Sequence, residues 1–228
     1  MQLRNYFQLI ENSNKRTLPE DKVWVVRLDA KGSKKISDLF LNEESSFTNA
    51  LLATAKDLSS RFFNCIIYTE SDEINILFLD NLKIGTCIGK PEMSKLNSYM
   101  GQVVFDEFNQ RYSGETTFFD SKAFYIQPKR VLSYLQYRFI FAENFSINYY
   151  ASRTGFCQRE HKKNEFMKVK LKDYKVDWDS LPSHNKQGSI FVNGKELFFD
   201  KNNLSHCLLE FFDIDDNILS PVTDNFFL

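Results

Sequence analysis

Two aspartates at the ends of apolar runs are candidates for metal-dependent chemistry. Asp29 ends the run "VWVVRLD", and Asp72 lies in the short acidic stretch "ESDE" between "CIIYT" and "INILFL". Adjacent carboxylates repel each other, so such a pair either shares a proton or holds a cation, and oxygen-only ligands suit Mg²⁺. The chemistry therefore depends on whether the fold brings the two carboxylates together.

The residues that follow Asp29 suit a ligand that carries phosphates. The segment "AKGSKK" supplies Gly32, where a backbone can approach a ligand closely, and the lysines Lys31, Lys34 and Lys35. Mg²⁺ usually completes its shell with substrate phosphates, so a nucleoside triphosphate is the natural partner of such a site. Each motif alone is also typical of an ordinary turn, and the segment is not a P-loop, which needs GxxxxGK followed by Ser or Thr.

The order of the expected elements determines where the two aspartates lie. The apolar patterns predict strands at 23–29, 65–69, 74–79 and 122–128, and helices at 45–63 and about 92–111. This β-α-β-β-α-β order is that of the ferredoxin-like arrangement. There the third strand neighbours the first, and the hairpin between strands two and three lies at the edge where strand one ends. We therefore expect Asp29 and Asp72 to face one point in space.

The length and composition are those of a single globular domain. With 228 residues, 43% hydrophobic and 26% charged, the chain can bury one substantial core, and disorder is not expected. No apolar run approaches the roughly 18 to 20 residues that cross a bilayer, and the first residues lack the apolar centre of a signal peptide. We expect a cytoplasmic protein without membrane contact. The four cysteines are widely separated, which predicts free, mostly buried thiols.

The charges are distributed unevenly along the chain. Residues 153–175 carry eight Lys and Arg against three acidic residues, whereas residues 193–228 carry two against seven. A basic stretch can follow a phosphate backbone or form a solvated face, and both interpretations stay open. Tyr149 and Tyr150 beside it could stack on unpaired bases of an RNA. The candidate RNA contacts are Arg130, Arg138, Arg153, Arg159, Lys162 and Lys163.

Three further patterns are interpreted as structural. Apolar residues at helical spacing in 131–150 predict a helix that packs on the core. The stretch "KIGTCIGK", 83–90, lacks GxGxxG spacing and is expected to be a turn between strands. His161, His184 and His206 have no metal-binding spacing with any cysteine.

Five blocks, in the same order along the chain, resemble the tRNA-histidine guanylyltransferase family and its relatives, 3′-to-5′ RNA polymerases that extend the 5′ ends of tRNAs. The resemblance covers most of residues 6–192. It is clearest in "VWVVRLDAKG", beside the family's "RxDGKGF", and in "YTESDEINILF", beside "YGQSDEYSFVF". Weaker matches are "SKLNS", "FFDSKAFYIQP" and "VDWDSLPSHNKQGSIFV". The chain is similar to a divergent Thg-like polymerase of the tRNA 5′-end repair type.

The resemblance implies a fold and a domain organisation. The fold class would be α+β, a ferredoxin-like βαββαβ palm of the polymerase and cyclase type with additional C-terminal helices and strands. The palm-type nucleotidyltransferase domain would cover 1–192, with its core at about 20–128 and a helical and basic extension at about 129–192. Residues 193–228 would form an acidic extension packed on the same domain. Family members commonly assemble as tetramers, which implies a homo-oligomer.

The resemblance also implies a mechanism and a set of site residues. Two Mg²⁺ ions would be bound by Asp29, the carbonyl of Ala30 and Asp72, with Asp29 and Asp72 as the catalytic pair. GTP or ATP would be the nucleotide substrate, and tRNA or another structured RNA would be extended at its 5′ end in the 3′-to-5′ direction. The residues expected to bind the nucleotide are Lys31, Gly32, Ser33, Lys34, Ser71, Glu73 and Lys95.

The chain also departs from the family's pattern. Its residues differ from the common ones at Ala30, Ser33, Glu92, Lys122 and Gln187. The family's His-Ile-Asn-Asn motif is absent near "FAENFSINYY", which argues against a strict guanylyltransferase for histidine tRNA. Two alternatives stay open: a palm-type nucleotide cyclase or oligonucleotide signal synthase, and a catalytically silent module that binds NTP or RNA.

Overall fold

The computed structural model describes residues 3–11, 17–32, 46–89, 91–154 and 164–198. The strands are β1 (Val23–Ala30), β2 (Cys65–Glu70), β3 (Glu73–Phe78), β4 (Phe119–Ile126), β5 (Ser189–Val192) and β6 (Lys195–Leu197). The helices are α1 (Leu3–Glu11), α2 (Ser46–Arg61), α3 (Asn81–Ile88), α4 (Met93–Asn109), α5 (Val131–Arg153), α6 (Asn164–Asp173) and α7 (Ser183–Lys186). Short 3₁₀ turns lie at Pro128–Arg130 and Trp178–Ser180.

The strands form one antiparallel sheet in the order β4-β1-β3-β2-β5-β6. The first four strands have the expected ferredoxin-like order, with the third strand beside the first. The expected α+β fold class and strand order are confirmed. Gly188 leads into β5 with φ +84°, and a Cβ there would lie 2.5 Å from the carbonyl oxygen of Thr69, so only glycine allows β5 to approach β2 this closely.

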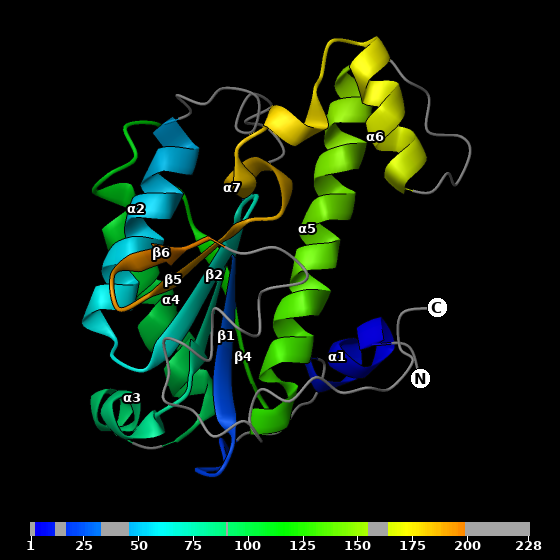
Figure 1. Cartoon of the computed structure of the whole chain (residues 1–228). Coiled ribbons are helices and arrows are strands. Elements are labelled where there is room, and N and C mark those ends of the chain that lie inside the picture. Colours follow the sequence, from blue (N-terminus) through cyan, green and yellow to red (C-terminus); the bar gives the residue numbers. More distant parts are fainter. Residues whose placement is uncertain (1–2, 12–16, 33–45, 90, 155–163, 199–228) are drawn as a thin grey trace.

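Helices cover both faces of the sheet, as Figure 1 shows: α2 and α4 lie on one side and α5 on the other. The alternation of strand side chains creates the two cores. In β1, Trp24, Val26 and Leu28 pack with α2 and α4, whereas Val23 and Val25 pack with α5 and α1. Each large apolar side chain buried in this way contributes about 1.5 to 3 kcal/mol to folding.

The long helix α5 extends past the sheet and carries a small third core with α6 (Figure 1). The buried residues there are Ile147, Tyr150, Ala151, Met167, Leu171 and Trp178. The helix expected at 131–150 is therefore confirmed. The acidic C-terminal stretch begins with β6, which pairs with β5, and residues 199–228 lie outside the described part of the chain.

One element differs from the expectation. The stretch 83–90, expected to be a turn between strands, lies largely in α3. Ile84 and Ile88, four residues apart, are both buried against the core, and Gly89 ends the helix with φ +76°. The glycines favoured a turn, but a helix lets both isoleucines pack against the core, and this burial outweighs the low helix propensity of Gly85.

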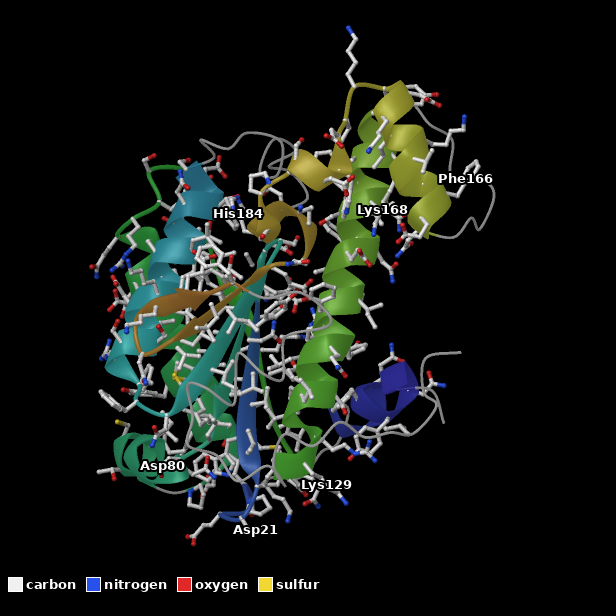
Figure 2. All side chains as sticks on the ribbon, viewed as in Figure 1. Asp21, Asp80, Lys129, Phe166, Lys168 and His184 are labelled. Atoms are coloured by element: carbon white, nitrogen blue, oxygen red, sulfur yellow. The ribbon has the colours of Figure 1, made fainter. Side chains whose placement is uncertain are left out.

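The cysteines fit the expectation in part. Cys65 is a buried free thiol and Cys87 an exposed one, while Cys157 and Cys207 lie outside the described residues. His184 lies on α7 near the upper end of the sheet (Figure 2), and the other two histidines are not described. Across the described ranges, no helix combines the length and apolar character that a membrane span requires.

Candidate active site

The sheet register places four carboxylates in one row. Asp29 of β1 pairs directly with Asp120 of β4 on one side and with Glu73 of β3 on the other, and Glu73 pairs with Glu70 of β2. Directly paired residues of antiparallel strands project to the same face. The four carboxylates therefore share the face that α5 covers. Like charges directly opposite each other are destabilising, so this row needs either compensating cations or a ligand.

The hairpin between β2 and β3 brings a fifth carboxylate, Asp72, to the end of β1. The amide of Ala30 donates a hydrogen bond to the carbonyl oxygen of Asp72 at 3.0 Å. Ser71 adopts a positive φ of 51°, and its hydroxyl lies 3.0 Å from Asp72 Oδ1. This tight turn and the bond to Ala30 hold the hairpin tip against the end of β1. The expected approach of Asp29 and Asp72 is what the structure shows.

The electrostatic cost of this arrangement appears in the pKa of Asp29. Partial burial raises that pKa to about 6, and the neighbouring charges of Asp72, Glu73 and Asp120 raise it as well, while Arg27 opposes them. The Asp29 side chain nevertheless keeps contact with solvent. A carboxylate that is accessible and crowded by other carboxylates is a place where a cation would be bound favourably.

The donor set fits a hard divalent cation. Asp29 and Asp72 offer carboxylate oxygens. Ala30 directly follows Asp29, lies in regular strand conformation and offers its backbone carbonyl oxygen. Within the ranges that the structure describes, no cluster of three or more His, Cys, Asp or Glu side chains could hold a metal ion. Side chains would then supply only part of the coordination shell, with backbone, water or substrate oxygens completing it. This is the usual way in which Mg²⁺ is bound.

Arg138 is the cation that compensates the charge of Glu70 and Glu73, the inner pair of the carboxylate row. Its guanidinium, from α5, donates hydrogen bonds to Glu70 and, at 2.6 Å, to Glu73 Oε2. Arg138 is 1% exposed and Glu70 is 4% exposed. Burial raises the pKa of Glu70 to about 8, against the opposing charge of Arg138. Arg138 thus joins α5 to both strands of the hairpin that carries Asp72.

This burial contradicts the expectation that Arg138 contacts RNA. The guanidinium lies under the sheet end between two carboxylates and cannot reach an external ligand from there. Glu73, expected beside the nucleotide, points to the same buried cation and also lies 3.9 Å from the Nε of Arg27. Glu73 thus helps to hold the hairpin through its ion pair with Arg138, next to Asp29 and Asp72.

The segment that is expected to wrap a triphosphate begins directly after β1. Gly32 has φ +83°, a backbone conformation that residues with a side chain rarely adopt. The Lys31 amide donates to the carbonyl oxygen of Phe118 at 2.8 Å, and its ammonium lies 2.7 Å from Asp120. Lys31 is therefore beside the carboxylate row, where it could move to a bound phosphate. Ser33 and Lys34 lie outside the described residues.

Lys95 lies in the first turn of α4, next to the place where the Leu18 amide donates to the carbonyl oxygen of Pro91. Two residues further along α4, the Asn97 side chain accepts a hydrogen bond from the Ser121 hydroxyl at 3.2 Å, and Ser121 directly follows Asp120 of the carboxylate row in β4. The part of Lys95 in phosphate binding stays a prediction.

The remaining candidates for RNA contact are scattered. Arg130 lies over the ring of Tyr6, 4.9 Å from its centroid, directly before the start of α5 and about two helical turns from Arg138. Arg153 is the last residue of α5, and Arg159, Lys162 and Lys163 lie outside the described part. The structure does not bring these residues together.

The lysines of α6 are paired with acidic residues. Lys168 contacts Glu143 and Glu165, Lys170 contacts Asp173, and Lys172 contacts Asp177 and Asp179. Figure 2 shows Lys168 between α6 and α5, the helix that carries Glu143. Of the two interpretations of the basic stretch, these pairs favour the charged solvated face for α6.

Sequence reasoning missed two residues of the row, Asp120 and Glu70. Asp120 could have been found from its block "FFDSKAFYIQP", because an antiparallel pairing of that strand with β1 sets an acidic residue near Asp29. Glu70 could have been found as the residue that ends β2. Its burial with Arg138 carries no signal in the sequence, since it depends on the way α5 crosses the sheet.

Comparisons with known proteins agree with this geometry. The family model described as "Thg1: tRNAHis guanylyltransferase" matches residues 4–128. A bacterial tRNA(His) guanylyltransferase (Thg1)-like protein in complex with ATP has a TM-score of 0.66 and 21% identity, over 83% of this chain and 88% of that one. Such a protein in complex with GTP has a TM-score of 0.64 and 22% identity, over 88% and 87%.

A eukaryotic structure shows the same fold. The tRNA(His) guanylyltransferase from Saccharomyces cerevisiae has a TM-score of 0.62 and 15% identity, over 85% of this chain and 94% of that one. At these identities the structural likeness concerns the fold. No curated protein sequence matches the chain.

Proposed function

The chain belongs to the tRNAHis guanylyltransferase family of nucleotidyltransferases, and we propose that it adds nucleotides to the 5′ end of tRNA or a similar structured RNA in the 3′-to-5′ direction. The observation that carries the proposal is the convergence of Asp29 and Asp72, fixed by the bond from the Ala30 amide to the Asp72 carbonyl. Nucleoside triphosphates are the proposed donors. This is supported by the solved relatives of the same fold in complex with ATP and GTP.

The proposed cofactor is Mg²⁺, as two ions held by Asp29, the carbonyl of Ala30 and Asp72. Bound there, the ions would supply Lewis-acid activation of the attacking hydroxyl and would stabilise the charge on the leaving pyrophosphate. The raised pKa of Asp29 supports this assignment, because its causes after partial burial are the neighbouring charges of Asp72, Glu73 and Asp120, which a cation would offset.

The chain's own residues position the reactants. Gly32, with its positive φ, lets the backbone curl after β1 so that amide groups can face a triphosphate. Lys31 brings a positive charge to the same place and is held near it by Asp120. Arg138, Glu70 and Glu73 keep the hairpin of Asp72 at a fixed position relative to β1. Phosphoryl transfer depends mainly on such positioning and charge stabilisation.

The test is nucleotide addition by variants at the pair. Wild-type protein, a tRNA transcript that lacks its 5′-terminal nucleotide, Mg²⁺ and labelled NTPs should give incorporation. Asp29→Asn and Asp72→Asn should each lower the rate by roughly a thousand-fold, since a bound metal contributes several kcal/mol to transition-state stabilisation. Asp21→Asn is the matched control, because Asp21 is an exposed aspartate at the opposite end of β1 (Figure 2) and should not change the rate.

Two results would contradict the proposal. One is the absence of incorporation by the wild-type protein on 5′-truncated tRNAs, and the other is full activity in both site variants. Nucleotide products formed from NTPs alone, dependent on Asp29 but not on RNA, would instead identify a palm-type cyclase or oligonucleotide synthase.

A further inference from the structure

Phe118 is an exposed aromatic ring in a well-ordered setting. Its side chain is 60% exposed although it immediately precedes β4. One face stacks on Phe105 of α4, with centroids 5.3 Å apart and an interplanar angle of 29°. The exposed surface of the ring therefore belongs to its opposite face and its rim. An exposed aromatic ring that is supported from behind is suited to stack on a flat ligand.

The backbone beneath this ring is held firmly. The side chain of Asn109 accepts a hydrogen bond from the Thr117 amide and donates one to the Thr117 carbonyl, both at 2.8 Å. The same Asn109 amide group also donates to the carbonyl oxygen of Phe105 at 2.8 Å. One side chain thus links the backbone of Phe105 to that of Thr117, the residue directly before Phe118. The two rings are positioned before any ligand binds, which lowers the ordering cost of stacking.

The ring lies next to the phosphate wrap of the proposed active site. The carbonyl oxygen of Phe118 accepts the Lys31 amide at 2.8 Å, and Phe119 pairs with Ala30 in the sheet. Asp120, two residues further, pairs with Asp29 and binds the Lys31 ammonium. A ligand with phosphates at Lys31 and Gly32 would therefore have Phe118 within the reach of its other end.

We propose that Phe118, supported by Phe105, is a stacking platform for a nucleobase at this site. The inference rests on the proposed function, because it takes the ligand of Lys31 and Gly32 to be a nucleotide. Aromatic side chains stack on every base, since each base has a flat π-face, and the contact needs no specific hydrogen bond. The base belongs either to the incoming NTP or to the 5′-terminal nucleotide of the RNA, and both carry phosphates beside it.

The experiment compares ligands with and without a base. The variants are Phe118→Ala and Phe118→Tyr, and the control is Phe63→Ala, a 56% exposed phenylalanine that lies before β2 at the far end of the sheet. The probes, in the presence of Mg²⁺, are ATP, GTP, inorganic tripolyphosphate, and an RNA acceptor-stem hairpin whose first nucleotide either carries a base or is abasic. Affinities are measured by calorimetry, and the thermal unfolding of each variant confirms its fold.

The expected result is selective. Phe118→Ala should weaken the binding of ATP and GTP, or of the RNA with a 5′-terminal base, by about 5- to 150-fold, as the loss of one stacked base predicts. Tripolyphosphate and the abasic RNA should bind equally to all variants, and Phe118→Tyr should behave as the wild type. Weaker NTP binding identifies the donor nucleotide as the stacked one, and weaker RNA binding identifies the RNA end.

Other results would overturn the inference. Equal affinities of wild type and Phe118→Ala for every probe would mean that no base stacks on this ring. An equal loss for probes with and without a base would show a structural effect only. A wild-type protein that binds neither NTP nor RNA would refute the proposed function, and the stacking platform with it.

Discussion

Two carboxylate pairs lie side by side at one end of the sheet, and they differ in how their negative charge is compensated. Glu70 and Glu73 share the buried guanidinium of Arg138. Asp29 and Asp72 lie beside them, and there the pKa of Asp29 stays raised to about 6 despite the nearby Arg27. The inner pair is thus compensated by a cation of the protein itself. The outer pair keeps an excess of negative charge in contact with solvent, as a cation site requires.

The difference suggests that the Glu70/Glu73 pair holds the hairpin in place, whereas the Asp29/Asp72 pair is left to bind a ligand. A buried ion pair costs much desolvation and seldom adds net stability over apolar residues, but breaking one is strongly destabilising. Arg138 therefore holds the hairpin in place, because moving the hairpin away would leave a buried charge without its partner. Asp29 and Asp72 are held against their repulsion by backbone contacts, among them the bond from Ala30 to Asp72.

Removing the inner cation should give the largest effect on stability. Arg138→Met leaves Glu70 and Glu73 buried without their guanidinium and should lower the free energy of unfolding by about 3 to 5 kcal/mol. Urea unfolding monitored by circular dichroism measures it. Where the variant stays folded, nucleotide addition should fall about 10- to 100-fold, as for other residues that orient metal ligands.

A second variant separates charge from packing. Adding Glu70→Gln to Arg138→Met replaces the buried carboxyl group that has lost its only cation partner in the salt bridges described above with a neutral amide, so the double variant should be more stable than Arg138→Met alone. Equal stability of Arg138→Met and wild type would break the comparison, because the inner pair would then not depend on its cation.

Much of this end of the molecule was predictable from sequence. Local apolar patterns and their order gave the four strands, the two crossover helices and hence the approach of Asp29 to Asp72, because chain order restricts how a ferredoxin-like sheet can pair. The family match confirms the resemblance seen in the motifs. The domain boundaries and a homotetramer stay predictions.

The error at Arg138 concerns long-range packing. Arg138 was assigned by residue type, but its surroundings depend on the place where α5 crosses the sheet, which is not encoded in nearby residues. An arginine at a helical position reads as a surface residue until its buried partners, Glu70 and Glu73, are known.

The outer pair should respond to pH as a cation site. Mn²⁺ binding, followed by electron paramagnetic resonance without nucleotide, should be independent of pH well above 6 and should weaken as pH falls through about 6, where Asp29 becomes protonated. Asp29→Asn should abolish this pH step. Unchanged Mn²⁺ affinity between pH 5 and 7 in the wild type would contradict the assignment of Asp29.

Stability without metal supplies the control for that experiment. The pKa of Asp29 is raised above its unfolded value of about 3.8, so the folded state binds this proton more tightly than the unfolded state. The contribution of Asp29 to stability therefore falls as pH rises from about 4 to 6 and stays low above that. Asp29→Asn should unfold at a higher temperature than wild type at pH 7.5, and the difference should shrink toward pH 4.

The smallest effect is expected on α6, where the charges are already balanced. Lys170 and Lys172 are exposed and paired with Asp173, Asp177 and Asp179, and surface pairs of this kind contribute little. Lys170→Gln and Lys172→Gln should leave RNA affinity, measured by filter binding over a salt series, within about twofold of wild type. If one of these lysines binds a phosphate, its substitution would instead weaken binding and lower the magnitude of the slope of log affinity against log salt by about one. That result would make α6 an RNA-binding surface and would place unbalanced charge in two regions of the molecule rather than at Asp29 and Asp72 alone.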